Sequence, residues 1–187
     1  VKAEAMPVMV PYMKLANSMG SFLSYLGEGQ VKSINIRYQG EVAAYDTNAL
    51  KAILLGSLLG RLTDERVNMV NAVLEAAKRG IKVTEEKQAV CENYANLITI
   101  EAVTSEGTTT VSGSVMRGES HLVQMNQFWI DIVPTGGWFL FSDHRDRPGL
   151  IGAVGKIAGD ADVNISYRHL SRLEPRGEAL MIMALDE

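Results

Sequence analysis

The chain has 187 residues, and its 18 Lys and Arg against 22 Asp and Glu give a formal net charge of −4. At about 100–200 residues per domain, this length predicts one large domain or two small ones. The mild excess of acid argues against a nucleic-acid partner or an anionic membrane surface, because both favour a basic face. Cys91 is the single cysteine, so the chain forms no internal disulfide and no thiolate zinc site.

The two ends of the sequence lack targeting signals. No basic segment followed by an apolar core opens the chain, and no run approaches about 18 apolar residues. We therefore expect no signal peptide, no membrane span and a cytoplasmic protein. The chain starts at Val1 without a Met and stops at Glu187 just after an apolar run, so we expect both ends to be cut.

The N-terminal sequence predicts a helix followed by a strand. Apolar residues recur at three- and four-residue steps after Pro11, which suits a first helical turn, and Gly27 and Gly29 end the pattern. The predicted buried stripe is Tyr12, Leu15, Ala16, Met19, Phe22, Leu23 and Leu26. Residues 31–38 then alternate between apolar and polar, as in a half-buried strand.

Two further helices are expected next. Asp46 or Thr47 caps the first, whose apolar stripe is Leu50, Ile53, Leu54, Leu58 and Leu62. Thr63 caps the second, with Asp64 and Glu65 in its first turn and Gly80 after its end. Its predicted buried stripe is Val67, Val70, Val73, Leu74 and Ala77.

The rest of the first 130 residues predicts an antiparallel sheet. We expect a short strand at 81–83, a polar loop at 85–93, a hairpin of 97–104 with 108–116, and a second hairpin of 121–125 with 128–133. Helices followed by such a sheet indicate an α+β fold. A linker at 134–137 then divides a first domain, 1–135, from a second, 136–187.

The second domain has the element order strand, helix, strand, strand. The expected ranges are 138–142, 150–158, 163–170 and 179–185, which make a βαββ unit.

A polar turn between the first strand and the helix of this unit is the strongest candidate site. Pro148-Gly149 opens the helix, so the backbone N–H groups that follow are unpaired and can hold a carboxylate. His144 and Asp146 alternate on the strand exit, and the amide of Asn164 opens the next strand. Together these groups could recognise a small amino acid, although charged residues in a turn are also often only solvated.

Other chemistry finds less support. His144 beside Asp146 could act as a general base, but no Ser or Cys nucleophile lies in an elbow-type turn nearby. His121 and His169 lie on predicted strands without metal-ligand spacing, so we expect no metal site. The glycines of 55–60 lie within a helical stripe, which favours close helix packing over a dinucleotide or phosphate loop, so we expect no cofactor site.

Several motifs, in order, resemble a known family. Residues 146–150 (DRPGL) and 163–165 (VNI) resemble the ACT domain, a small ferredoxin-like βαββαβ module that binds amino acids and regulates metabolic enzymes. Upstream, 32–34, 38–41, 67–72, 79–81, 111–115 and 128–131 resemble the intervening domain of long-form D-3-phosphoglycerate dehydrogenase. The resemblance covers nearly the whole chain from about residue 7.

The resemblance implies a regulatory, non-catalytic part of that enzyme. The family oxidises 3-phosphoglycerate with NAD in L-serine biosynthesis, and its catalytic and NAD-binding residues lie in upstream domains, so none is assigned to this chain. L-serine binds allosterically between paired ACT domains. The matching positions are His144, Asp146 and Asn164, with the amides of Gly149 and Leu150 facing the carboxylate. Expected partners are L-serine, a second copy in a dimer or tetramer, and the catalytic domains.

The sequence departs from the family in two places. Some members bind an anion in the intervening domain through clustered basic residues, but here Pro134-Thr135 stands where such members carry arginine. The ACT module also lacks its second helix and fourth strand. Two alternatives stay open: a regulatory subunit of an L-serine dehydratase, which joins related domains, and an interaction module that binds no ligand.

Overall fold

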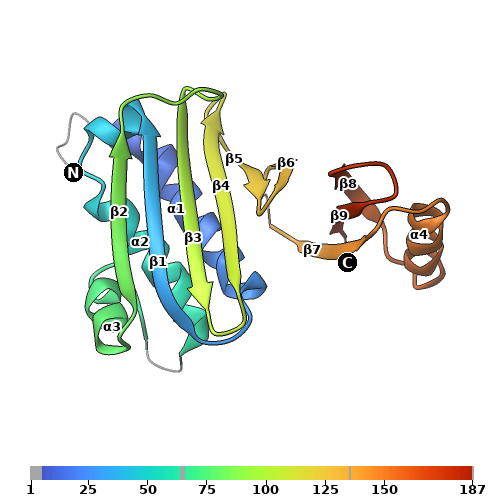
Figure 1. Ribbon diagram of the computed structural model, residues 1–187, viewed down its shortest axis with the longest axis horizontal. Coiled ribbons are helices and arrows are strands. Elements are labelled where there is room, and N and C mark those ends of the chain that lie inside the picture. The colour runs from blue at the N-terminus through green and yellow to red at the C-terminus, as the bar shows by residue number, and fades with distance from the viewer. Residues whose placement is uncertain (1–5, 64–65, 135, 187) are drawn as a thin grey trace. The chain divides into compact units, whose positions relative to one another are not determined.

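The computed structural model describes residues 6–63, 66–134 and 136–186. The chain forms two compact units, one of Val1–Asn126 with Ile132–Pro134 and one of Gln127–Asp131 with Thr135–Glu187. The first unit holds three of the α-helices and most of a large sheet, and the second holds one helix and a small sheet (Figure 1). Val1, Thr135 and Glu187, on which the predicted chain ends and linker depend, lie outside the described residues.

The first helix, α1 (Met6–Leu26), follows the predicted stripe and adds to it. Its buried residues are Met9, Tyr12, Leu15, Ala16, Met19, Gly20 and Leu23, whereas Phe22 and Leu26 are partly exposed. The predicted start at Pro11 is wrong, because the helix already runs from Met6 and holds Pro11 inside it. A proline this close to the start removes one backbone hydrogen bond, and the burial of Met9 and Tyr12 on either side offsets that loss.

Helix α2 (Asn48–Leu62) packs beside α1 (Figure 1). Thr47 is its N-cap residue, and the Asp46 carboxylate accepts from the Asn48 backbone N–H at 3.1 Å. The buried side chains are Leu50, Leu54, Leu55, Leu58 and Leu59. Leu62, which the sequence placed in the stripe, is 42% exposed.

The helix predicted from Thr63 is much shorter than expected. Helix α3 covers only Ala72–Lys78, and Asp64 and Glu65 of its predicted first turn lie outside the described residues. Asn68 and Asn71 explain the late start. Asn71 Oδ1 accepts from the Asn68 N–H and Asn68 Oδ1 accepts from the Val70 N–H, both at 2.8 Å. Such side-chain bonds satisfy the backbone in a loop and compete with the helix.

The predicted stripe of α3 is therefore largely outside the core. Val70 is 90% exposed, while Ala72, Glu75 and Ala76 are the buried residues of the helix. We expect Val70→Ala to change the free energy of unfolding by less than about 0.5 kcal/mol. The fully buried Val111 is the matched control, and Val111→Ala should cost about 2 kcal/mol through lost burial and a cavity. Equal losses in urea titrations would contradict this exposed position for Val70.

The large sheet has the strand order β2-β1-β3-β4-β5-β6. Strand β1 (Val31–Gly40) buries Ile34, Ile36 and Tyr38 completely, and α1 and α2 lie behind the sheet in Figure 1. Strand β3 (Asn96–Thr104) pairs antiparallel with β1, and β2 (Lys82–Gln88) pairs parallel with it. The predicted loop at 85–93 is thus wrong over its first residues. Residues 82–88 do not alternate between apolar and polar because β2 is an edge strand whose side chains are mostly exposed.

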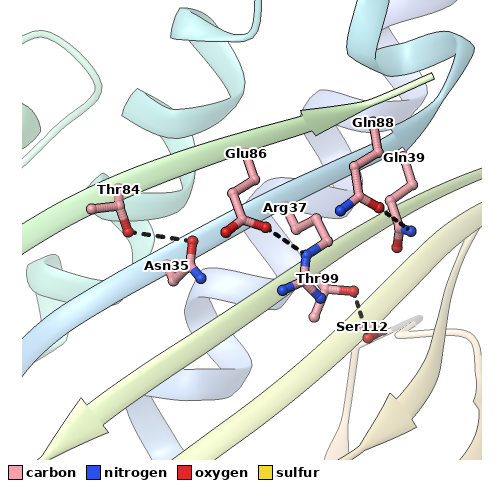
Figure 2. Close-up of polar contacts among 8 residues, drawn as sticks. All are labelled: Asn35, Arg37, Gln39, Thr84, Glu86, Gln88, Thr99 and Ser112. Atoms are coloured by element: carbon pink, nitrogen blue, oxygen red, sulfur yellow. Dashed lines mark hydrogen bonds and ion pairs between the residues drawn. The ribbon is translucent and has the colours of Figure 1, made fainter.

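The opposite face of this sheet is polar and internally paired (Figure 2). Between β1 and β2, Asn35 contacts Thr84 at 3.3 Å, Arg37 contacts Glu86 at 2.9 Å, and Gln39 contacts Gln88 at 2.9 Å. Each pair lies directly in register. These cross-strand bonds stabilise the edge strand, which has little apolar surface of its own to bury.

The expected hairpin of 97–104 with 108–116 forms, and the strand after it adds a second antiparallel hairpin. Strand β4 (Thr108–Met116) follows β3 through the predicted turn at 105–107. Strand β5 (Glu119–Met125) follows β4 through Arg117 and Gly118, both with positive φ, and β6 (Phe128–Ile132) continues after Asn126. Two positive-φ residues in a two-residue loop match the twist of the hairpin strands.

The second unit has the predicted βαββ order. Strand β7 (Trp138–Arg145) leads to α4 (Leu150–Asp160), followed by β8 (Ile165–Arg172) and β9 (Glu178–Leu185). The strand order is β7-β9-β8, and both outer strands pair antiparallel with β9. The core is centred on β9, where residues 179–183 are buried, whereas no residue of α4 is fully buried. The α+β fold class is confirmed, with the correction that the first sheet is mixed.

Candidate functional site

A cavity lies where β7 and β8 end. Both strands are antiparallel to β9, so they run in the same direction and their carboxyl ends meet at one edge of the sheet. Ligands often bind at this edge in sheets that a helix crosses. The cavity has a volume of about 430 Å³, and its walls come from the β7–α4 loop, the first turn of α4, the end of β8 and the β8–β9 turn. Its lining includes His144, Asp146, Gly149, Leu150, Arg172 and Arg176.

His144 lines the cavity from the C-terminal end of β7. Its Nδ1 lies 3.0 Å from the backbone carbonyl oxygen of Ser142. A carbonyl only accepts, so this contact assigns the proton to Nδ1 and leaves Nε2 as an acceptor in the neutral ring. The imidazole can therefore receive a hydrogen bond from a hydroxyl or ammonium group.

Asp146 is the most strongly bonded residue of the cavity. Its Oδ2 accepts from Arg172 Nη1 at 2.7 Å and from the Arg176 backbone N–H at 3.3 Å. Its own N–H donates to the carbonyl of Gly177 at 2.8 Å. The hydrogen bond from Arg172, followed by that from Arg176, lowers the pKa of the Asp146 carboxyl below its ordinary value. The cavity therefore holds an ionised carboxylate at neutral pH.

Gly149 and Leu150 form the start of α4 at the same cavity. Gly149 is the N-cap residue with φ of 87°, a left-handed conformation that glycine adopts without strain. Its carbonyl accepts the first helical bond, from Ala153 at 2.9 Å. The backbone N–H groups of the first turn have no helical acceptor, and they carry the positive end of the helix dipole. This arrangement suits a carboxylate.

Asn164, the remaining predicted ligand residue, does not line this cavity. Asn164 directly precedes β8, whose first residue, Ile165, pairs with Leu185 of β9. Leu185 in turn pairs with Trp138 at the start of β7, so Asn164 lies near the start of β7. His144 lies six positions after Trp138 along the strand, a distance of about 20 Å. The Asn164 amide donates instead to the Asp186 carboxylate at 2.6 Å. Within one chain, His144 and Asn164 thus lie near opposite ends of the strands.

Arg172 and Arg176 are cavity residues that the sequence reading missed. They lie 26 and 30 positions after Asp146 in the sequence, in a strand end and a turn that carry no motif. One signal was available. In a strand–helix–strand unit the two strands are parallel, so their C-terminal ends lie at the same end of the sheet. A charged residue at the end of the second strand therefore lies near the loop that follows the first strand.

The other residues that the sequence suggested as possible binding groups do not form a site. Arg37 is paired with Glu86, while Lys32 and Arg117 belong to opposite ends of the β1–β3–β4 register. The glycines of 55–60 lie within α2, where no strand precedes them, so they cannot form a dinucleotide loop. Over the ranges that the structure describes, no three His, Cys, Asp or Glu side chains gather as metal ligands, and no helix has the length and hydrophobicity to cross a membrane.

The fold and site together define a class of protein. The first unit is an α+β domain with helices on one face of a mixed sheet, and the second is a βαββ module with a polar cavity at its strand ends. Residues 8–126 match the family described as the D-3-phosphoglycerate dehydrogenase intervening domain. The chain belongs to this family, which confirms the resemblance seen in the sequence. The match covers most of the first unit.

Similarity to whole dehydrogenases extends over nearly the entire chain. The chain is 34% identical over 186 residues to the D-3-phosphoglycerate dehydrogenase of Synechocystis sp., covering 98% of this chain and 33% of that protein. It is 35% identical over 178 residues to that of Bacillus subtilis, covering 94% and 34%. For Methanocaldococcus jannaschii the identity is 30% over 186 residues, covering 100% and 35%. The chain thus spans about a third of the length of these relatives.

Proposed function

We propose that this chain is a regulatory part of a D-3-phosphoglycerate dehydrogenase of L-serine biosynthesis and binds L-serine in its second unit, a partial ACT domain. The observation that carries the proposal is the cavity that joins an ionised Asp146 to the start of α4. The family match and the relatives support the enzyme class. In this proposal the NAD-binding and catalytic residues belong to other domains of the enzyme, which are the partners of this chain.

The cavity offers a group for each functional group of L-serine. The first-turn N–H groups at Gly149 and Leu150 suit the carboxylate, Asp146 suits the ammonium group, and Nε2 of His144 can accept from the hydroxyl. Opposite charges on one small ligand thus meet opposite charges on the protein. A ligand that lacks either charge would leave the matching group of the cavity desolvated and without a partner. The site would therefore bind such a ligand more weakly than L-serine.

Asp146→Asn should weaken L-serine binding by about 30-fold, because a hydrogen bond to a charged group contributes about 1.5–3 kcal/mol. Isothermal titration calorimetry on the 187-residue chain measures this. Lys156→Gln is the matched control, since it removes an exposed charge of α4 that is paired with Asp160 at 2.8 Å, outside the cavity. If the wild-type chain releases no heat with millimolar L-serine, the proposed ligand is wrong.

The position of Asn164 favours a site shared between two copies. Strand β8 is an outer strand of the β7-β9-β8 sheet among the described residues. If two β8 strands pair antiparallel about their centres, the partner's Asn164 meets the Arg172 end of β8, beside the cavity. Such pairing also covers exposed apolar surface, including Tyr167 and Leu170 at 39% and Ile157 at 69%. We therefore propose a symmetric dimer as the binding unit.

Complementation tests this dimer directly. His144→Ala and Asn164→Ala should each abolish most L-serine binding when measured alone. Mixing the two variants should restore binding, because a mixed dimer holds one site with an intact His144 and an intact Asn164. The expected stoichiometry is one ligand per mixed dimer in calorimetry. Normal L-serine binding by Asn164→Ala alone would show that each cavity is complete within one chain. Loss of binding in both variants without recovery after refolding them together would contradict the shared site.

A further inference from the structure

Asp146 is held by three hydrogen bonds that join separate parts of the cavity wall. Its backbone N–H donates to Gly177, and its Oδ2 accepts from Arg172 and from the Arg176 backbone. We propose that Arg172 is the positioning residue of this site, which fixes the Asp146 carboxylate so that one oxygen stays available to the ammonium group of the ligand. This inference rests on the proposed function, because it assigns a role within the L-serine site.

The contact between Arg172 and Asp146 differs from an ordinary surface ion pair. The Asp146 side chain is 18% exposed and that of Arg172 is 52% exposed, whereas both members of the Lys156–Asp160 pair are more than 60% exposed. A second donor, the Arg176 N–H, reaches the same oxygen, so the carboxylate has a defined rotation and not merely a nearby charge. Exposed ion pairs of flexible side chains contribute little to stability. A pair orients a carboxylate when the carboxylate is enclosed and a second donor also binds it.

The bonding leaves the other carboxylate oxygen free. Both donors reach Oδ2, and no other described residue donates to Asp146. A carboxylate has acceptor capacity on each oxygen, so Oδ1 can still accept from an ammonium group. Without Arg172, the side chain would rotate and the ligand would have to order it on binding, which lowers affinity.

The charged and titratable groups of the cavity wall are His144 on β7, Arg147 on the loop, Arg172 on β8 and Arg176 in the turn. Of these, Arg172 and His144 act on the pKa of Asp146 through their charge, and Arg172 also donates the shorter of the two hydrogen bonds to the carboxylate. Replacing Arg172 should therefore raise the pKa of Asp146 toward the ordinary value of an aspartate, about 3.9.

Calorimetry with L-serine gives the first test. Arg172→Gln should weaken binding by about tenfold, the size of one lost charged hydrogen bond, while Arg172→Lys should recover part of it. Lys156→Gln should bind as the wild type does. The decisive comparison adds Arg172→Gln to Asp146→Asn: if Arg172 acts through Asp146, it should cause little further loss there. An undiminished tenfold loss in the Asp146→Asn background would show that Arg172 contacts the ligand itself and would overturn the proposal.

A measurement without ligand separates this inference from the proposed function. ¹³C NMR titration of the aspartate carboxyls, with Asp146→Asn to assign the resonance, reports the pKa of Asp146 in the ligand-free chain. We expect a higher pKa in Arg172→Gln than in the wild type and Lys156→Gln. His144 is present in all three proteins, so the difference isolates Arg172. An unchanged pKa would overturn the positioning role. If the pKa rises but wild-type protein binds no L-serine, the proposed ligand fails and the Arg172–Asp146 linkage stands.

Discussion

Replacing Gly40 by alanine is expected to lower the free energy of unfolding by about 4 kcal/mol. Gly40 ends β1 with φ of 86° and ψ of −156°, a backbone region that only glycine adopts readily. A Cβ atom there would also clash with the backbone carbonyl of Ala95, which cannot move without disturbing the start of β3. The strain of the dihedral angle and the clash add, so urea titration should show a large fall in the midpoint.

Gly118→Ala is the control that separates these two causes. Gly118 has a similar φ of 82°, but no described atom lies within 4 Å of the position of its Cβ. It therefore bears only the dihedral strain, at about 1 kcal/mol. If the two variants lose equal stability, the close approach of Ala95 contributes nothing and the packing at the end of β1 is not as described.

Gly20→Ala should lower the free energy of unfolding by about 3 kcal/mol, at the upper end of the usual cost of overpacking. Gly20 is a buried residue of α1 at the contact with α2. A Cβ atom would clash with the carbonyl of Leu54 and lie 3.0 Å from the Cβ of Ser57. One neighbour is a backbone atom and the other is a Cβ atom fixed to the backbone. The clash can therefore be relieved only if the two helices move apart.

The matched control is Gly60→Ala in α2. Among the described atoms, the nearest to a Cβ at Gly60 is the Val67 carbonyl oxygen at 3.7 Å, an ordinary contact. Alanine should therefore stabilise this helix by up to about 1 kcal/mol. Thermal and urea unfolding of both variants should move in opposite directions, and a loss of stability at Gly60 comparable to that at Gly20 would contradict the helix contact described.

The sequence predicted the regular elements well where one face is buried. The stripe of α1 and the alternation of β1 follow from periods of 3.6 and 2, which the burial of Leu15 and Ile36 requires. The βαββ order of the second unit follows from the same two periods, although no residue of α4 is fully buried. Failures occurred where burial does not control the pattern: β2 is an exposed edge strand, and Asn68 and Asn71 replace a helical turn by their own hydrogen bonds.

The site was predictable in part. His144, Asp146, Gly149 and Leu150 are close in the sequence, and a strand that turns into a helix keeps them together. Arg172 could not be placed from local pattern, because its contact with Asp146 depends on the pairing of β7 and β8 with β9. The separation of Asn164 from the cavity has the same origin in strand register.

The sequence by itself determined the α+β class, most strands, the start of α4 at Gly149 and the family, because these depend on local periodicity, turn chemistry and ordered motifs. Only the tertiary structure decided that Gly20 and Gly40 are positions of close backbone approach, that the apolar residues near Val70 stay exposed, and that Asp146 is held by Arg172. Contacts between residues distant in the chain depend on strand register and helix packing, which no local pattern encodes.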